Sequence, residues 1–232
     1  MDLIFDGVRE AFSILAHGKN DVWGIAMRSL LISGTSTFLA MALGLALGST
    51  LAFNRFPGRN VAIAFVNTGM GFPPVVIGLF VAIMLFRSGP LGDLNLIYTP
   101  AAMVIAQTIL ATPFVTGFTV AALSSLPPRL RPQLYALGAS RLQMLWLVIQ
   151  EARLLLLAAL MAGFGHAISE VGASMMVGGN LQGETRVFTT AILNEVSKGN
   201  FDIAIALALI LLTLIFIVNA VLTTVQQRGR AT

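Results

Sequence analysis

Residues 129–153 read RLRPQLYALGASRLQMLWLVIQEAR, a polar stretch between two long apolar segments. Its charged side chains are Arg129, Arg131, Arg141, Glu151 and Arg153. Lipid can satisfy neither such charges nor an irregular backbone, so the stretch must lie outside the hydrocarbon core. Pro132 suits the first turn of a helix, leucines follow near helical spacing, and Gly138 separates a first piece from a second. The pattern predicts a short surface helix with an apolar face, available to a soluble partner.

The composition is that of a membrane protein. Of the 232 residues, 56% are apolar and 10% are charged, whereas about a quarter of the residues in ordinary soluble domains are charged. The chain has no cysteine, which excludes disulfides and thiolate metal sites. It also lacks a basic stripe interleaved with aromatic residues, so nucleic-acid binding is not expected. Its first residues do not resemble a signal peptide, and we expect no cleaved leader.

Five apolar segments are long enough to cross a bilayer. They are residues 30–53, 61–86, 100–126, 146–170 and 203–225. The sequence therefore predicts an all-α, polytopic bundle of five transmembrane helices. The transmembrane domain would cover residues 29–226, with a short cytoplasmic tail at 227–232.

Glycines and prolines mark special positions in these segments. Gly69, Gly71, Pro73 and Pro74 interrupt the second one, which should be kinked or broken at membrane depth. Pro113 should kink the third. Gly44 and Gly48 form a GxxxG pair in the first, which favours close packing of helices within the chain; a dimer face is the alternative.

Residues 1–28 form a separate arm. Apolar and charged residues alternate at helical spacing over residues 2–18, which is typical of an amphipathic helix that lies in the membrane interface. Basic residues in short loops then set the orientation. With the N-terminus outside, the inner loops hold Arg55, Arg59, Arg129, Arg131, Arg141, Arg228 and Arg230 without an acid beside them. We therefore expect a multi-pass protein of the cytoplasmic (inner) membrane, with its N-terminus outside and its C-terminus in the cytoplasm.

Residues 129–153 resemble the EAA loop of binding-protein-dependent ABC importer permeases. That loop reads EAA, three residues, Gly, nine residues and Ile-x-Leu-Pro. Gly138 stands at the motif glycine and Val148 at the isoleucine. The sequence departs from the pattern elsewhere: the triplet is replaced by Pro132, Gln133 and Leu134, and Leu-Pro by Gln150 and Glu151.

A second stretch makes the resemblance more specific. Residues 165–200 read GHAISEVGASMMVGGNLQGETRVFTTAILNEVSKGN. They are similar to tungstate-type permeases, which carry EVGA, MMVGGN, GxTR, TTAI and KGN in this order. Molybdate and sulfate permeases are less similar, with GE(F/Y)G and AGN instead. The resemblance covers essentially the whole chain.

The resemblance implies the type I ABC importer fold and an ATP-driven uptake system. A second copy of the chain would complete a central path, and two cytoplasmic ATPase subunits would bind ATP and Mg. An extracytoplasmic binding protein would deliver a tetrahedral oxyanion, tungstate first, for import by alternating access. The chain itself would hold no cofactor and catalyse no reaction. The alternatives are the same machine for molybdate or sulfate, and a membrane scaffold without transport.

The coupling helix of these permeases falls within the loop at residues 129–146. The residues implied for ATPase coupling are Leu134, Tyr135, Leu137, Gly138, Ala139, Ser140, Arg141 and Leu142. An apolar face would enter a groove of the ATPase, and the small residues would permit close approach. The rival interpretation is a surface helix packed on its own bundle.

Eight residues at and after the end of the fourth span are candidates for the translocation path or gate. They are Glu170, Gly172, Ser174, Met175, Met176, Gly179, Asn180 and Thr185. Neutral donors and backbone N–H groups suit brief contact with a dianion. The flexible apolar side chains of the two methionines suit a closing constriction. The alternative is ordinary packing between helices.

Glu170 leaves two interpretations open, because His166, Ser169 and Glu170 are spaced to share one helix face. It lines a path or gate, or it is a structural acid bonded to a neighbouring broken helix. A carboxylate would repel a dianion, so we expect Glu170 to organise the gate without touching cargo. Ser169 and His166 lack a hydrolytic context, and His166 and Glu170 lack further metal ligands. Glu184 replaces the lysine that a P-loop requires.

Overall fold

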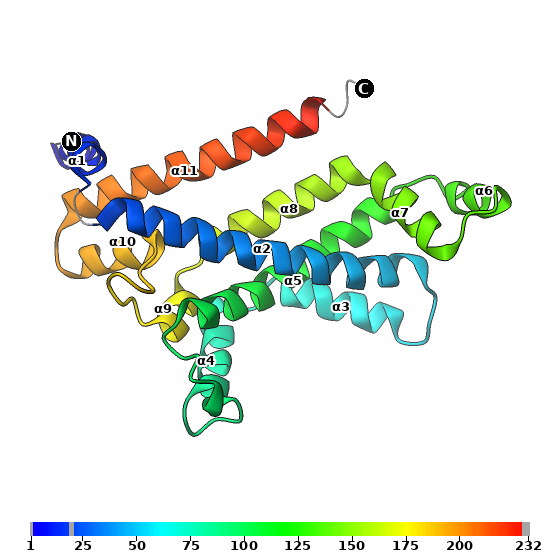
Figure 1. Ribbon diagram of the computed structural model, residues 1–232, viewed down its shortest axis with the longest axis horizontal. Helices are drawn as coiled ribbons and strands as arrows, with labels where there is room; N and C mark the ends of the chain where they lie inside the picture. Colours follow the sequence, from blue (N-terminus) through cyan, green and yellow to red (C-terminus); the bar gives the residue numbers. More distant parts are fainter. Residues whose placement is uncertain (1, 19–20, 229–232) are drawn as a thin grey trace.

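The computed structural model describes residues 2–18 and 21–228, and within these ranges every regular element is a helix (Figure 1). In chain order the helices are α1 (Asp2–His17), α2 (Val22–Phe53), α3 (Arg59–Gly69), α4 (Pro74–Leu85), the 3₁₀-helix η2 (Gly92–Leu94), α5 (Pro100–Ser124), α6 (Leu130–Ala136), α7 (Arg141–Glu151), α8 (Arg153–Ile168), α9 (Gly172–Gly178), α10 (Phe188–Ser197) and α11 (Phe201–Arg228).

Three of these helices, α2, α5 and α11, are long and apolar enough to cross a membrane. Two further pairs, α3 with α4 and α7 with α8, qualify only when each bent pair is taken as one span. The described chain therefore offers up to five spans, which agrees with the five predicted segments. The predicted all-α bundle is confirmed.

The centre of the bundle is the packing of α2 along α5. A Cβ atom added to Gly44 would lie 2.6 Å from Val115 Cγ1, and one added to Gly48 would lie 2.6 Å from Thr119 Cβ. The two glycines of the GxxxG pair therefore let α5 approach the α2 backbone. This contact supports packing within the chain, the first of the two uses that the sequence left open.

The first span begins earlier than predicted. Helix α2 starts at Val22, so the predicted boundary at residue 28 falls inside it, and α1 ends at His17. The charge of Arg28 does not end the helix because its guanidinium is satisfied within the protein. It pairs with Asp21 and donates to the carbonyl oxygens of Arg186 (3.1 Å) and Gly183 (3.2 Å).

The second span is broken, as the glycines and prolines predict. Helices α3 and α4 meet at an angle of 100° across residues 70–73, and Figure 1 shows α4 leaving the line of the bundle. Pro74 occupies the first turn of α4, where its missing N–H costs nothing. By contrast, α5 continues as one helix through Pro113, whose ring packs close to Gly69 of α3.

The prediction of one helix over residues 146–170 is wrong. The chain bends by 73° between α7 and α8, with Ala152 at the joint. Met144 and Val148 bury the inner face of α7 against the bundle, whereas Glu151 and Arg153 stay exposed on either side of the bend. Helix α7 therefore belongs to the polar loop, and the apolar part of the span is α8 alone.

The helix ends gather at opposite ends of the molecule. In Figure 1, α1 and α10 lie at one end and α6 and α7 at the other. The C-terminal turns of α11 reach the beginning of α8, where Gln226 Nε2 donates to the carbonyl oxygen of Leu154 at 2.7 Å. The N-terminal helix and the end of α11 therefore do not share an end of the bundle, as an odd number of spans requires.

The α2–α5 contact can be tested with matched glycine substitutions. We expect Gly44→Ala to destabilise the protein by about 1–3 kcal/mol through overpacking. Gly34→Ala, on the same helix, is the control, because a Cβ there meets no atom within 4 Å. Thermal unfolding of the purified chain in detergent measures both. Equal melting temperatures for the two variants would contradict the packing role of Gly44.

Candidate functional site

The corner between α6 and α7 begins with a helix stop at Gly138. Gly138 has φ +86°, a conformation that glycine adopts without strain. Its N–H donates to the carbonyl of Tyr135 at 3.0 Å, and the next N–H, of Ala139, donates to the carbonyl of Leu134 at 3.0 Å. This pair of bonds is a Schellman motif, which satisfies the last carbonyls of α6.

A helix start follows at once. The N–H of Gln143 donates to Ser140 Oγ at 3.3 Å, and the N–H of Ser140 donates to Gln143 Oε1 at 2.8 Å. This reciprocal capping box begins α7. The predicted break at Gly138 is confirmed, but the expected single surface helix is two helices that meet at a corner.

The corner has an outer and an inner side. Leu137 is 84% exposed and Leu142 is 79% exposed. Trp146, one helical turn beyond Leu142, and Tyr135 are exposed as well. These large apolar side chains form an exposed patch on the outer side of the corner.

The inner side packs on the bundle. Leu134 and Ala139 lie against an apolar cluster formed by the buried residues Ala122, Leu123, Met144, Val148, Ala152 and Leu156. Two of the eight residues predicted for coupling therefore pack the corner against the bundle. Tyr135, Leu137 and Leu142 form its exposed side. The remaining three, Gly138, Ser140 and Arg141, are exposed at the turn.

At the other end of α8 lies Glu170, a buried carboxylate that is 6% exposed. Its Oε1 accepts a hydrogen bond from the N–H of Ala173 at 2.8 Å, in the first turn of α9. Its backbone carbonyl accepts one from Thr189 Oγ1 at 2.9 Å, in α10. Glu170 therefore joins the end of α8 to α9 and α10; its partners do not include the broken helix pair α3 and α4.

The expected shared face of His166, Ser169 and Glu170 is not formed. Helix α8 ends at Ile168, and Ser169 Oγ donates back to the carbonyl of Gly165 at 2.8 Å. Because the chain leaves the helix there, the Glu170 side chain turns toward α9. His166 stacks on the Phe114 ring instead, with the ring centres 4.3 Å apart.

Helix α9 packs between α4 and α5. A Cβ on Gly172 would lie 2.5 Å from Val75 Cγ2, and one on Gly78 of α4 would lie 2.6 Å from Ala173 Cα. Ser174 is fully buried, and its hydroxyl accepts a hydrogen bond from Gln107 Nε2 of α5 at 3.2 Å. The glycines at these positions therefore allow backbone-to-backbone contact across the broken second span.

The segment after α9 is folded upon itself. Thr185 is buried, and its Oγ donates to the carbonyl of Gly178 at 2.5 Å and accepts from the N–H of Leu181 at 2.8 Å. Asn180, with φ +53°, accepts a hydrogen bond at its Oδ1 from Arg186 Nε at 3.2 Å. Asn180 and Thr185 thus hold this loop in shape.

All eight residues predicted for the path or gate lie on α9 or beside it. Gly179 ends α9 with φ +68° and is exposed, and a Cβ added to it would lie 2.8 Å from Tyr98 Cδ1. Met175 and Met176 are partly buried, and Met176 joins the apolar cluster around α4 and α5. The sequence interpretation missed Gln107, although a lone amide within an apolar span is a visible signal. It also missed Arg28, whose partners are distant in sequence.

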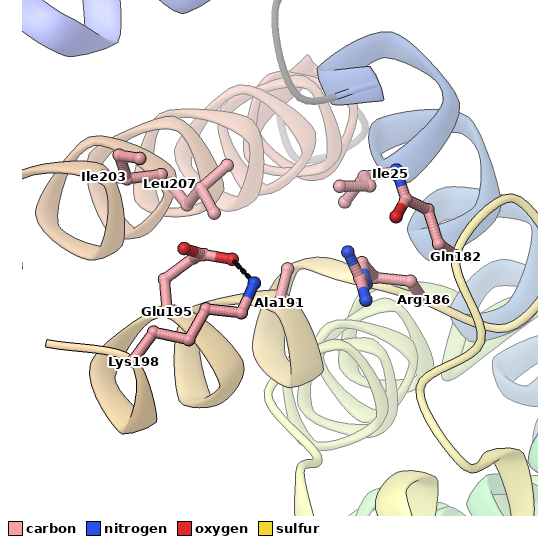
Figure 2. Close-up of a pocket in the computed structure, with 8 residues that line it drawn as sticks. All are labelled: Ile25, Gln182, Arg186, Ala191, Glu195, Lys198, Ile203 and Leu207. Carbon is pink, nitrogen blue, oxygen red and sulfur yellow. Dashed lines mark hydrogen bonds and ion pairs between the residues drawn. The ribbon is translucent and has the colours of Figure 1, made fainter. Parts of the chain in front are cut away.

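A small cavity of about 150 Å³ opens near this loop, between α2, α10 and α11 (Figure 2). Arg186 and Gln182 lie on one side of it, and Glu195, bonded to Lys198 at 2.7 Å, lies on the other. Burial raises the pKa of Glu195, but hydrogen bonds from Lys198, Asn200 and Asn194 and the Lys198 charge outweigh it and hold the pKa below its ordinary value. Glu195 is therefore ionised at neutral pH, and Arg186 remains the unbalanced charge of the cavity.

Among the described residues, no three His, Asp or Glu side chains gather as ligands would. The structure is that of a polytopic helical membrane protein with an exposed apolar corner at one end and a Gly-rich layer around Glu170.

The family follows from comparison with known proteins. The sequence profile of the "Binding-protein-dependent transport system inner membrane component" family matches residues 40–231. The chain belongs to this family.

Relatives and a solved structure agree with this assignment. A probable anion ABC transporter permease of Haloferax volcanii is 44% identical over 83% of this chain and 85% of its own length. The tungstate uptake system permease of Peptoclostridium acidaminophilum is 38% identical over 98% of this chain and 100% of its own. A chain of the MetNI methionine ABC transporter, in an inward-facing conformation, superposes with a TM-score of 0.72 at 19% identity, covering 90% of this chain and 98% of that one.

The role of the Glu170 carboxylate can be tested by two replacements. Glu170→Gln keeps an oxygen acceptor for the N–H of Ala173, and we expect it to retain most of the stability. Glu170→Ala leaves that buried N–H unpaired, at a cost of roughly 1–3 kcal/mol. Thermal unfolding in detergent compares the two variants. If Glu170→Gln destabilises the protein as much as Glu170→Ala, the hydrogen bond to α9 is not what the carboxylate contributes.

Proposed function

We propose that this chain is the permease subunit of an ATP-driven importer for a tetrahedral oxyanion, most specifically tungstate. The observation that carries the proposal is the similarity to a tungstate permease over nearly the whole of both chains. The EVGA, MMVGGN and KGN elements of residues 165–200 support it. Two copies of the chain would enclose the path and work with two ATPase subunits, which bind ATP and Mg.

The exposed corner is the proposed contact with the ATPase. Leu137 and Leu142 provide the apolar surface that helix-in-groove binding requires, and the glycine stop at Gly138 brings the backbone close to the partner. In this proposal the corner is cytoplasmic, because arginines outnumber acids in the loops at its end. The N-terminus is then outside, and α1 lies along the outer interface.

Helix α9 and its flanking loop are the proposed gate. Glu170 directs its carboxylate to the N–H of Ala173, so its charge is engaged and a dianion meets mainly neutral groups. Backbone N–H groups and hydroxyls bind an oxyanion weakly enough to release it. Alternating access follows if ATP binding changes the separation of the two corners, because a ligand shifts a conformational equilibrium only through unequal affinity for its states.

The cavity in Figure 2 is the proposed contact region for the binding protein. It lies at the end of the bundle opposite the corner, where α10 and the loop after α9 meet. Arg186 and Gln182 provide donors for an acidic or amide side chain of the partner. Delivery of the ion there places it beside α9.

The substrate is tested by the ATPase activity of the complete complex. With the chain reconstituted beside its ATPase and binding protein, we expect tungstate to stimulate ATP hydrolysis at lower concentrations than molybdate or sulfate. The reason is that the ion-loaded binding protein favours the state that hydrolyses ATP. A preference for sulfate or molybdate would reassign the cargo. Purification of the chain without any ATPase partner would favour the scaffold alternative.

The corner is tested by Gly138→Glu. We expect this variant to insert normally but to lose at least ten-fold in transport per ATP hydrolysed, because a charged side chain blocks the docking surface. Gly58→Glu is the matched control: Gly58 lies in the turn between α2 and α3, also has φ +86°, and also has no atom within 4 Å of an added Cβ. Uptake and ATPase assays in proteoliposomes measure both. Coupled transport in Gly138→Glu at the level of Gly58→Glu would remove the docking role.

A further inference from the structure

A second polar cavity, of about 400 Å³, lies between the end of α2 and the corner. It is separate from the cavity in Figure 2, because no residue lines both. The lining residues are Ser49, Thr50, Phe53, Asn54, Arg131, Tyr135, Arg141, Met144 and Leu145. The cavity thus connects the last turn of the first span with α6 and α7.

Arg131 is held firmly at this cavity. Its Nη1 donates to the carbonyl of Phe53 at 3.3 Å, and its guanidinium carbon lies 4.4 Å from the centre of the Phe53 ring. The first contact places a cation at the C-terminal end of α2, where the helix dipole favours it. The Nε atom of Arg131 is buried without a hydrogen-bond partner. The contacts with Phe53 fix the guanidinium at the cavity, and no acid of the described chain neutralises its charge.

Arg141 provides a second cation among the lining residues. It is exposed at the first turn of α7, and its guanidinium has no hydrogen bond or ion pair within the part of the chain that the structure describes. No acidic residue lines the cavity within that part either. Between Asp21 and Glu151 the sequence contains a single acid, Asp93. That residue lies in η2, which follows α4, away from the corner.

The donors of the cavity select the ligand chemistry. Ser49 and Thr50 already donate their hydroxyl protons to the carbonyl of Ala46, so the available donors are the two guanidiniums, the Asn54 amide and the Tyr135 hydroxyl. Guanidinium groups match the oxygens of a phosphate group with paired hydrogen bonds. Phe53, Met144 and Leu145 add an apolar wall, which a fully hydrated ion does not need.

From this geometry we propose that the Arg131–Arg141 cavity binds a phosphate group, and specifically the headgroup of an anionic membrane lipid. The cavity lies where the first span ends, at the level of the lipid headgroups, and basic pockets at such positions take anionic lipids. Inorganic phosphate shares the same chemistry and is the second source. The bound group bridges α6 and α7 and braces the corner against α2. Only this bracing role rests on the proposed function; the binding itself does not.

The test uses the full-length chain in detergent, with its melting temperature as the readout. Three additions are compared: dioleoylphosphatidylglycerol, dioleoylphosphatidylcholine and sodium phosphate. We expect phosphatidylglycerol to raise the melting temperature by about 5 °C, because a ligand that binds the folded state stabilises it. Phosphatidylcholine, whose ammonium group neutralises its phosphate, should leave it unchanged.

Arg141→Gln should abolish at least half of this rise. It should leave the melting temperature without lipid unchanged, because the Arg141 guanidinium makes no hydrogen bond or ion pair within the described chain. Arg153→Gln is the matched control, since Arg153 is also exposed near the corner but does not line the cavity. It should keep the full rise. Arg131→Gln is a second variant, informative where its melting temperature without lipid stays near that of the wild type.

Each outcome decides the proposal. A rise with sodium phosphate that also depends on Arg141 supports the phosphate site with a soluble source. Equal shifts in Arg141→Gln and Arg153→Gln, or equal shifts with the two lipids, overturn it. An unchanged melting temperature with every addition also overturns the proposal. Contact with a protein partner would then be the remaining explanation for the two arginines. Because the assay contains neither ATPase nor cargo, failure here is distinct from failure of the proposed transport function.

Discussion

Four residues, Leu137 to Ser140, contain the end of one helix and the beginning of the next, and the shape of this end of the bundle depends on the join between them. Gly138 closes α6 with backbone bonds, and Ser140 opens α7 with its side chain. A residue other than glycine at φ +86° would strain the backbone by about 1–2 kcal/mol. The join turns Leu137 and Leu142 outward while Leu134 and Met144 face the bundle. The bonds that shape the corner come from residues 133–143, so its geometry does not need the missing EAA triplet.

Local signals in the sequence were sufficient where the cause of a structure is local. Apolar length located the spans, and glycine and proline located the break after α3 and the stop at Gly138. Sequence reasoning failed where the cause is a distant partner. Arg28 stays inside α2 because carbonyl oxygens more than 150 residues away accept hydrogen bonds from its guanidinium. The bend at Ala152 depends on burial of α7 against the bundle, which no local pattern of residues 146–170 shows.

Polar side chains within the spans fall into two groups, and this division locates the site better than polarity itself. Most serine and threonine hydroxyls bond to a carbonyl one turn earlier in their own helix, as Thr37, Thr112 and Thr116 do. Such bonds satisfy the hydroxyl and leave no function to explain. Gln107 and Glu170 differ because both bond to α9: Gln107 reaches Ser174 from α5, and Glu170 accepts from the N–H of Ala173 three residues further on. The sequence identified Glu170 as exceptional but could not show that its partner is the backbone of α9.

Helix α8 connects the corner to the layer around α9, and its two ends explain how the two sites can act together. At its beginning, the bend at Ala152 lies in the same apolar cluster as Leu134 and Ala139, so α8 starts in direct packing contact with the corner. At its end, Glu170 bonds to α9 through its side chain and to α10 through its backbone. A helix of 16 residues is rigid over about 24 Å. In the proposed transport cycle, α8 is the element that would carry a displacement of the corner to α9 at Glu170. The break between α3 and α4 places α4 against both α5 and α9.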